Sequence, residues 1–433
     1  MKSSALCGKE SFTTLFARPD ATGLLVLPDR PLLQWINGLL RAESSPGNAG
    51  SCDFLNALAE KFGAEGFADQ LYRELFDLFI AHGVPADAIA QDSGDENRRF
   101  ILDNAVDFLT ELGGIARNAV KTSSRRLSPE AKKLAALLPD SSDPGKIAAE
   151  IAAHDRFSRC RTFRFDGENL VEAQVGSAKK ISSFYGFAGV RAIIADHLAD
   201  FRRGLVNVPL LIHSLPGYGK TSMTISYALA EKDDVLVLAG PDALSASWSR
   251  LYALLAARPD RRFILFFDDI EPENVDWYMF RTHVGGAYSL PKHILVVLAS
   301  NYEFPASILS RGRSVTFPVF DELRCTEMVE DFLRDFGLKR PPENLVALLG
   351  ADYTEAFGQK KFTELSPRTL MRHLLVYAQS REKRQLLADM STGEVITRPD
   401  PTLFYEFNIE LMRTLYGDHY IERLREEKLR NLK

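Results

Sequence analysis

Hydrophobic positions recur with two different periods along this chain of 433 residues. From residue 30 to about residue 158, apolar side chains return every three or four positions, which predicts a helical N-terminal region. From residue 184 onward, helix-like segments alternate with short, continuously apolar runs, at residues 209–213, 234–239, 263–267, 293–299 and 314–319. Such runs are typical of strands that are buried on both faces. The alternation predicts a parallel sheet with helices on both faces, which is an α/β fold.

Breaks in these patterns divide the chain into five predicted parts. Residues 162–165 and 170–173, separated by Asp166 and Gly167, predict a β-hairpin that serves as a linker. After residue 320 the pattern is helical again. The predicted parts are an all-α N-terminal domain (1–158), the hairpin linker (159–183), an α/β core (184–320), a helical unit (321–390) and a C-terminal helical extension (391–433).

The stretch from residue 209 to 227, PLLIHSLPGYGKTSMTISY, has the order strand, glycine-bearing turn and helix. In the pattern G-x-x-x-x-G-K-[ST], the turn wraps a polyphosphate, the Lys reaches the β- and γ-phosphates, and the hydroxyl residue holds Mg²⁺. Lys220 and Thr221 fit these roles, at a helix N-terminus that adds partial positive charge. Ser214 replaces the first glycine, which is tolerated unless the backbone there requires a positive φ. The predicted nucleotide contacts are Pro216, Gly217, Tyr218, Gly219, Lys220, Thr221 and Ser222.

Polar residues follow two of the predicted strands. Asp268 and Asp269 come directly after FILFF, and Asn301 follows HILVVLAS. Because ligands of open α/β sheets bind at the carboxyl ends of the strands, we expect these side chains to lie beside the phosphate loop. Asp268 would then hold Mg²⁺, Asp269 would face the attacking water, and Asn301 would hydrogen-bond the γ-phosphate. The alternative is that these residues only begin turns.

Three arginines are further candidates for phosphate contact. Arg311 and Arg313 precede the last predicted strand, where a guanidinium could reach the γ-phosphate of a neighbouring subunit. Arg368 lies in the first turn of the helix that SPRTL opens. A cation there is unfavourable by about 0.3–1 kcal/mol unless an anion offsets it, and a nucleotide phosphate would be such an anion.

Tyr185 and Gly186, within FYGF, lie shortly before the phosphate loop in the sequence. A flat aromatic face suits a purine base, so these two residues are candidates for contact with the nucleotide base. Ordinary packing of aromatic side chains in the core explains the same pattern, and the sequence leaves the two interpretations open.

Composition narrows the class of protein. With 45% hydrophobic and 26% charged residues, the chain is typical of soluble globular proteins. A net charge of −5 argues against a dedicated binder of nucleic acid or anionic membranes, so a protein is the expected partner. No apolar run approaches about 18 residues, and the N-terminus lacks a secretory signal pattern, which predicts a cytoplasmic protein. The four scattered cysteines predict neither a zinc site nor a disulfide framework.

With these motifs in order, residues 184–338 resemble an AAA+ ATPase. FYGFAGVR, LIHSLPGYGKT, RRFILFFDDI and ILVVLASN are particularly similar to a bacterial AAA+ family defined as a predicted ATP-binding domain of unknown function. The resemblance implies a P-loop NTPase fold, in which a three-layer sandwich with a five-stranded parallel sheet precedes a helical lid on residues 321–390. It also implies ATP and Mg²⁺ as cofactors. The resemblance assigns Walker A to Gly217, Gly219, Lys220 and Thr221, Walker B to Asp268 and Asp269, sensor 1 to Asn301, sensor 2 to Arg368 and the arginine finger to Arg311 or Arg313.

One departure from the wider AAA+ pattern bears on the rate of hydrolysis. Asp269 stands where a Glu usually polarises the attacking water. Its carboxylate ends one methylene short, and a misplacement near 1 Å can cost on the order of a hundredfold in rate, so we expect slow hydrolysis. Glu271 or Glu273 could reach back into the site. We favour Asp269 over Glu273, because the strand fixes its position.

The sequence leaves two functions open. The first is an ATPase that rearranges its lid and subunits on a macromolecular partner, as a homo-oligomer in which the finger serves the neighbouring site. The second is an ATP-sensing scaffold with little hydrolysis. Residues 240–248, GPDALSASW, lack the aromatic, apolar and glycine triplet of threading AAA+ machines, which argues against a substrate-threading unfoldase.

Overall fold

The computed structural model describes residues 32, 48–92, 94–138, 143–176, 178–284, 290–379 and 398–431. It separates into two compact units, Met1–Cys160 and Arg161–Lys433, which we call unit 1 and unit 2 and describe individually. The predicted boundary near residue 390 lies outside the described residues. Among the described residues, no helix has the length and apolar character that crossing a membrane requires.

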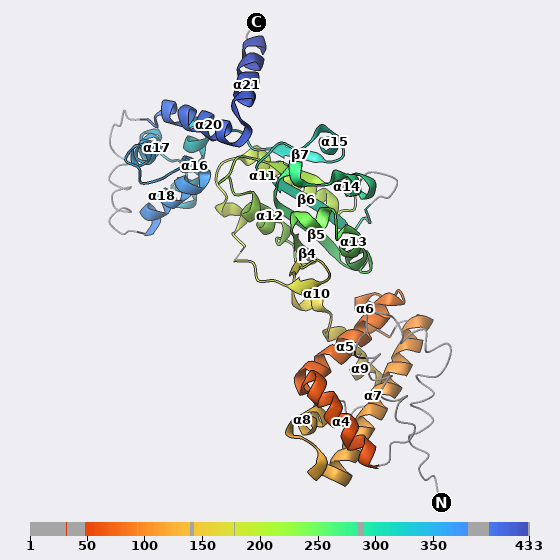
Figure 1. Ribbon diagram of the computed structural model, residues 1–433. Helices are drawn as coiled ribbons and strands as arrows, with labels where there is room; N and C mark the ends of the chain where they lie inside the picture. The colour runs from red at the N-terminus through yellow and green to blue at the C-terminus, as the bar shows by residue number, and fades with distance from the viewer. Residues whose placement is uncertain are drawn as a thin grey trace, which may run out of the picture. The chain divides into compact units, whose positions relative to one another are not determined.

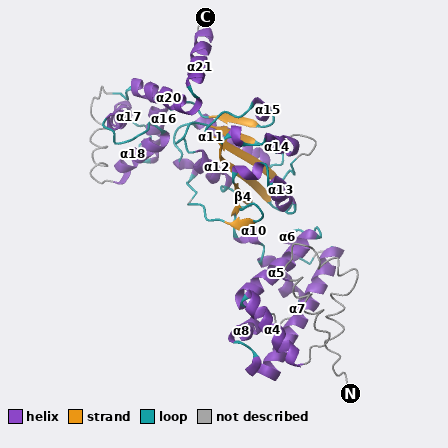
Figure 2. Cartoon of the chain, viewed as in Figure 1, coloured by secondary structure: helices purple, strands orange, loops and turns teal. Residues whose placement is uncertain are grey.

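In unit 1, every element that the structure describes is a helix (Figures 1 and 2). The helices are α4 (Asn48–Phe62), α5 (Ala64–Ala81), α6 (Ala86–Ile89), α7 (Glu96–Ser123), η1 (Ser124–Arg126), α8 (Pro129–Leu137), α9 (Pro144–Ala153) and α10 (Arg156–Arg159). Their apolar faces share one core, in which Phe67, Phe79 and Leu109 are fully buried. Asp95 and Ser128 accept hydrogen bonds from backbone N–H groups at the starts of α7 and α8, which fixes where these helices begin.

Unit 2 is built around one sheet, whose strands are β1 (Thr162–Phe165), β2 (Leu170–Glu172), β3 (Leu210–His213), β4 (Asp234–Ala239), β5 (Arg262–Ile270), β6 (Ile294–Ser300) and β7 (Arg313–Thr316). The strand order is β2-β1-β4-β5-β6-β3-β7. All neighbouring strands are parallel except β1 and β2, which form an antiparallel hairpin. The predicted α/β class is confirmed, and the sheet, expected to be parallel, is parallel except for the β1–β2 hairpin.

The five strands expected in residues 184–320 are β3 to β7, and β1 and β2 extend the sheet to seven strands among the described residues. The hairpin expected to be a linker extends the sheet, since Thr162 to Arg164 of β1 pair with Leu236 to Leu238 of β4. The side chain of Asp166 closes the hairpin turn by accepting hydrogen bonds from the N–H groups of Glu168 and Asn169, at 2.9 and 2.7 Å. Pairing with β1 removes the exposed edge that β4 would otherwise present.

Helices cover both faces of the sheet (Figure 1). They are α11 (Ala188–Arg202), α12 (Lys220–Ala228), α13 (Trp248–Ala256), α14 (Trp277–His283) and α15 (Ala306–Leu309), with the short helices η2 (Ile181–Ser183), η3 (Pro241–Leu244) and η4 (Pro272–Asn274). Leu210 and Ile212 of β3 belong to the core that α11 and α12 share. On β5, Phe267 packs against Trp248 of α13, with ring centroids 6.3 Å apart. Trp248 in turn packs against Phe280 of α14.

After β7, every element that the structure describes is a helix. The elements are α16 (Glu322–Asp335), α17 (Glu343–Gly358), α18 (Pro367–Gln379), α20 (Pro401–Tyr416) and α21 (Asp418–Asn431). Buried residues of α16, α17 and α18, including Val329, Leu349 and Leu370, join the core that covers one face of the sheet. Helix α20 joins it through Phe404. These helices therefore pack on the same unit that carries the phosphate loop.

Candidate nucleotide-binding site

The predicted phosphate loop lies between the end of β3 and the start of α12, at the carboxyl ends of the parallel strands. Gly217 and Gly219 have φ angles of 86° and 85°, a conformation that L side chains adopt at a cost. Lys220 is the first residue of α12, so the N–H groups of the first turn have no partner within the helix and the positive end of the helix dipole lies at the loop. Thr221 and Ser222 follow on the exposed first turn, and Pro216 is partly buried.

Lys220 is buried, with 6% of its surface exposed. Its ammonium donates three hydrogen bonds, to Ser214 O at 3.1 Å, Ser214 Oγ at 3.0 Å and Asn301 Oδ1 at 2.6 Å. Burial lowers the pKa of Lys220 to about 8. The Ser that replaces the first loop glycine therefore provides two of the three acceptors for this lysine, a role that the sequence pattern did not predict.

Thr221 and Asp268 lie together, as the predicted magnesium site requires. Thr221 Oγ1 donates to Asp268 Oδ2 at 2.5 Å, and burial raises the pKa of Asp268. The other carboxylate oxygen, Asp268 Oδ1, is buried without a hydrogen-bond partner. An orphaned acceptor beside a hydroxyl fits Mg²⁺, which prefers oxygen ligands and commonly uses one or two carboxylates with substrate phosphates. No cluster of three His, Cys, Asp or Glu that could cage a metal occurs in the described residues.

Asp269 lies in a β-bulge rather than in regular strand. The pairing of β5 with β6 is regular up to Phe267, which pairs with Leu298, and resumes at Ile270, which pairs with Ser300. Asp268 and Asp269 on β5 therefore lie opposite a single residue of β6. Asp269 is exposed and has a φ of 49°, a left-handed conformation that Asp adopts more readily than most residues. Bulges re-aim side chains. Asp268 is partly buried and Asp269 is exposed, so the two acids have different environments.

The two glutamates that follow are placed differently from Asp269. Glu271 Oε2 accepts a hydrogen bond from Asn274 Nδ2 at 2.6 Å, which holds it within its own turn. Glu273 is exposed in η4.

Asn301 is held at the end of β6 by contacts on both sides. Ser300 is fully buried, and its hydroxyl donates to Ile270 O at 2.6 Å and accepts from Tyr302 N–H at 2.8 Å. These bonds fix the loop that presents Asn301 Oδ1 to Lys220. Ser300 thus supports the site, although the sequence marked it only as a strand end.

The start of α18 contacts the phosphate loop directly. Arg368 N–H donates to Gly217 O at 3.1 Å. A Cβ atom on Gly217 would lie 2.9 Å from Ser366 Oγ, so glycine is needed there for close approach as well as for its φ angle. The Arg368 side chain is exposed, and its positive charge contributes to lowering the pKa of Lys220. The negative charges of Asp268 and Asp269 act in the opposite direction and raise the pKa of Lys220 more than Arg368 lowers it.

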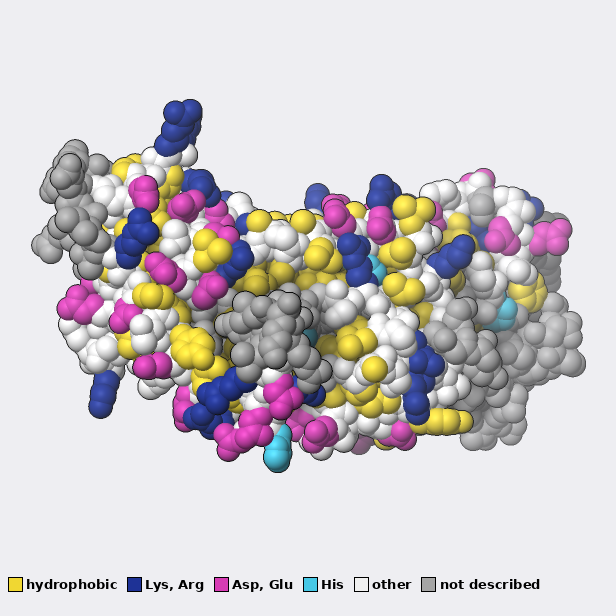
Figure 3. Space-filling view, turned by 90° about the horizontal axis from the view of Figure 1, so that it is seen from above, with side chains coloured by type: hydrophobic (Ala, Val, Ile, Leu, Met, Phe, Trp, Pro, Cys, Tyr) yellow, Lys and Arg dark blue, Asp and Glu magenta, His cyan; other side chains and the backbone are white. Residues whose placement is uncertain are grey.

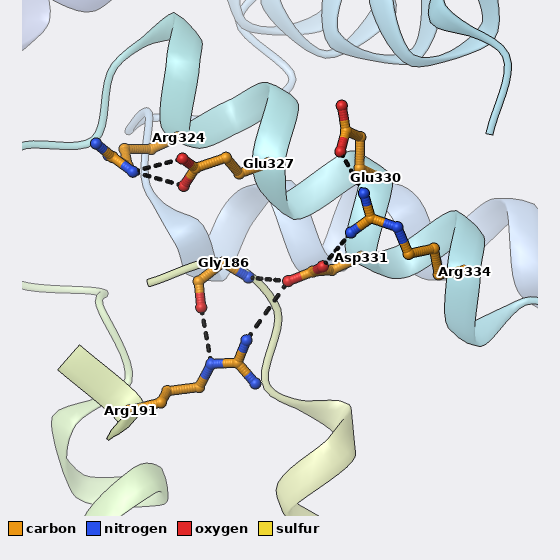
Figure 4. Close-up of polar contacts among 7 residues, drawn as sticks. All are labelled: Gly186, Arg191, Arg324, Glu327, Glu330, Asp331 and Arg334. Atoms are coloured by element: carbon orange, nitrogen blue, oxygen red, sulfur yellow. Dashed lines mark hydrogen bonds and ion pairs between the residues drawn. The ribbon is translucent and has the colours of Figure 1, made fainter. Parts of the chain in front are cut away.

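Tyr185 and Gly186 pack against α16. Tyr185 OH donates to Asp335 Oδ2 at 2.6 Å, and its ring lies edge-on to Phe332, with centroids 6.1 Å apart. Figure 4 shows the Gly186 N–H donating to Asp331 Oδ2, at 2.8 Å, and the Gly186 carbonyl accepting from Arg191. These contacts favour the packing interpretation of FYGF. Contact of Tyr185 and Gly186 with a nucleotide base stays a prediction.

Tyr218 lies in the core, although its backbone belongs to the loop. It is 5% exposed, its ring packs against Phe187 and Phe317, and its hydroxyl accepts from Phe320 N–H at 2.5 Å. Its side chain anchors the loop, and only its backbone is available to phosphate.

Arg311 and Arg313 lie away from this site. Arg313 begins β7 and pairs with Leu210, the first residue of β3, whereas the phosphate loop follows the last residue of β3. Arg311 donates to Ser307 O at 2.5 Å within its own turn. The two arginines are thus at the amino ends of the strands, and a role in a neighbouring subunit's site stays a prediction.

Neither a protein-family model nor a curated protein sequence matches the chain. Solved structures with a similar arrangement include the Thermotoga maritima RuvB Holliday junction branch migration motor, at 16% identity over 46% of this chain and 72% of that chain, with a TM-score of 0.28. Caenorhabditis elegans PCH-2 is 15% identical over 54% of this chain and 70% of that chain, with a TM-score of 0.31. Likenesses at these TM-scores do not define a function, and the chemistry of the site is inferred from the geometry of the chain itself.

Proposed function

We propose that the chain is a magnesium-dependent ATPase of the AAA+ type. The observation that carries the proposal is the pairing of Thr221 with Asp268, whose second oxygen is buried and without a partner beside the buried ammonium of Lys220. A cation, a hydroxyl and an unsatisfied carboxylate oxygen at a helix N-terminus are complementary to a nucleotide polyphosphate with its metal.

In this proposal Thr221 and Asp268 hold Mg²⁺, which when bound neutralises charge on the β- and γ-phosphates. Lys220 exchanges its three present acceptors for phosphate oxygens. Arg368 adds a second positive charge from the start of α18. Asn301 would orient the γ-phosphate and the attacking water. The water oxygen would bond to the γ-phosphorus as the bond from that phosphorus to the β,γ-bridging oxygen breaks and ADP leaves, and Asp269 would accept a proton from the water. Its short side chain makes the reaction slow.

A homo-oligomer with the helices after β7 as a lid completes the proposal. Arg311 or Arg313 would act on the adjacent subunit's nucleotide, because neither approaches the phosphate loop of its own chain. ATP hydrolysis would move the lid relative to a bound partner, and that partner would be a protein rather than a nucleic acid. Acidic and basic side chains are mixed over the described part of the face in Figure 3, without the broad basic area that binds phosphate backbone.

An ATP-sensing scaffold is the second candidate, and one observation favours it: the exposed, left-handed Asp269 is the candidate base with the shortest reach. Phosphate release by the purified protein with ATP and Mg²⁺ separates the two functions. The ATPase proposal predicts turnover above that of Lys220→Ala and loss of turnover with excess chelator. Tight ATP binding with turnover no higher than that of Lys220→Ala would establish the scaffold instead.

A further inference from the structure

Helix α20 ends at the candidate nucleotide site. Its last residue, Tyr416, donates a hydrogen bond from its hydroxyl to the backbone oxygen of Asn301, at 2.8 Å. Gly417, with a φ of 78°, ends the helix directly afterwards and so fixes where the Tyr416 side chain leaves it. The C-terminal part of the chain thereby contacts the residue that binds Lys220.

The same hydroxyl reaches the strand that leads into the phosphate loop. His213 Nε2 lies 3.1 Å from Tyr416 OH, and His213 is the last residue of β3. A phenol has one hydrogen, and the Asn301 carbonyl can only accept it. His213 must therefore donate from Nε2, which fixes its tautomer. The hydroxyl oxygen of Tyr416 therefore takes part in hydrogen bonds to both His213, at the end of β3, and Asn301, in the loop after β6.

Ring packing holds the Asn301 loop from the same side. The Tyr302 ring packs edge-on against the Tyr416 ring, with ring centroids 6.1 Å apart. The ring of Tyr420, in α21, also packs against Tyr416, with ring centroids 4.4 Å apart. Tyr420 OH donates to Glu303 Oε1 at 3.2 Å. The two residues that follow Asn301 are thus held by the C-terminal helices: Tyr302 contacts α20, and Glu303 contacts α21.

The other end of α20 is attached to the predicted lid and to its connection with the sheet. Asn408 Nδ2 donates to Phe320 O at 2.9 Å, and Phe404 packs edge-on against the Phe320 ring. Phe320 lies just before α16 in the segment that joins β7 to the predicted lid. Phe407 contacts Phe357 of α17, with ring centroids 5.8 Å apart. One helix therefore spans from α17 to Asn301.

We propose that Tyr416 is a positioning residue for Asn301, and that α20 transmits the position of the predicted lid to the loop that senses the γ-phosphate. The inference rests on the proposed ATPase function and extends it. Tyr416 does not touch phosphate; it acts by holding the Asn301 backbone, so that Oδ1 faces Lys220 and the γ-phosphate. A loss of this hydrogen bond loosens the transition-state geometry more than it weakens nucleotide binding.

The test compares Tyr416→Phe with Tyr405→Phe in steady-state ATP hydrolysis. Tyr405 is on the same helix and is 61% exposed, so its variant is the matched control. For Tyr416→Phe we expect kcat to fall about tenfold or more, with KM for ATP changed less than about twofold, since a small misplacement acts mainly on the chemical step. Tyr405→Phe should keep both wild-type values. A Tyr416→Phe protein with wild-type kcat overturns the inference.

A double variant separates positioning from a general effect on the fold. If Tyr416 acts through the Asn301 side chain, Tyr416→Phe should cause no further loss in an Asn301→Ala background. An undiminished effect in that background contradicts the inference. Wild type and Lys220→Ala are measured in the same experiment. If wild type does not exceed Lys220→Ala, the ATPase proposal fails and this inference with it; if it does, the outcome for Tyr416 concerns the inference alone.

Discussion

Lys220 Nζ lies 2.6 Å from Asn301 Oδ1, although the two residues are 81 positions apart in the chain. The contact joins the phosphate loop to the end of β6. It also shows that the lysine is occupied by protein acceptors, which a polyphosphate would have to replace. Because burial lowers the Lys220 pKa to about 8 from 10.5, nucleotide binding should depend on pH in a range where ordinary lysines do not titrate.

The first prediction concerns how ATP affinity changes with pH. Phosphate favours the charged lysine, so above about pH 8 binding must take up a proton, and ATP affinity should fall by up to about tenfold per pH unit. Calorimetric titration near pH 7 and near pH 9 measures this change. Lys220→Arg, whose guanidinium stays charged, is the control and should show a flatter profile. Equal pH dependence in wild type and Lys220→Arg would show that Lys220 is not the titrating group.

The second prediction concerns the two loop glycines. Both have positive φ angles, but only Gly217 has a neighbour that an added Cβ would strike, namely Ser366. Gly219→Ala should cost about 1–2 kcal/mol of stability from backbone strain alone. Gly217→Ala should cost more, because α18 must also move away from the loop. Urea unfolding of the two variants measures the difference, and equal losses would mean that α18 does not press on the loop.

The third prediction identifies the group that activates water. Asp269→Asn should abolish turnover while leaving ATP affinity unchanged, whereas Glu273→Gln should have little effect. Single-turnover hydrolysis of bound ATP measures both. The reverse pattern would assign the role to Glu273, and undiminished hydrolysis in both variants would exclude the two candidates.

A fourth prediction tests the arginine finger across subunits. A protein with both Arg311→Ala and Arg313→Ala keeps its phosphate loop but lacks the finger, while Lys220→Ala keeps the finger but lacks the loop lysine. In an oligomer, mixing the two inactive proteins should restore part of the hydrolysis, because each supplies what the other lacks. Light scattering with ATP and Mg²⁺ should show a mass above one chain. A mixture no more active than its components would refute the shared site.

A fifth prediction concerns the buried charge at the amino ends of β4 and β5. Asp234 is 0% exposed and pairs with Arg202 at 2.6 Å and Arg262 at 2.8 Å. Asp234→Asn removes the buried carboxylate that both cations share and leaves Arg262 only the exposed Asp233, so it should cost about 3–5 kcal/mol of unfolding free energy. Asp233, an exposed neighbour 3.7 Å from Arg262, is the control, and Asp233→Asn should cost less than about 1 kcal/mol in the same urea titration. Similar losses of unfolding free energy in the two variants would show that the burial of Asp234 does not make its ion pairs more important than that of Asp233.

The parts of this site that the sequence predicted are those encoded locally. The apolar runs before Asp268 and Asn301 indicated where two strands end, and the carboxyl ends of parallel strands lie along the same edge of a sheet. The parts that were missed depend on pairing between distant segments. The hairpin could not be placed in the sheet without knowing that β4 is an outermost strand of the set β3 to β7, and the bulge at Asp269 exists only relative to β6. Tyr416 is 115 positions from Asn301, and no local pattern marks it.

The central claim is that Lys220, Thr221 and Asp268 bind ATP with Mg²⁺, and calorimetric titration of ATP tests it most directly. Wild type should bind ATP more tightly with Mg²⁺ than with chelator, and Asp268→Asn should remove that difference. Lys220→Ala should weaken binding at least about tenfold, or about 1.4 kcal/mol. Wild-type affinity in Lys220→Ala, or an undiminished magnesium effect in Asp268→Asn, would contradict the account.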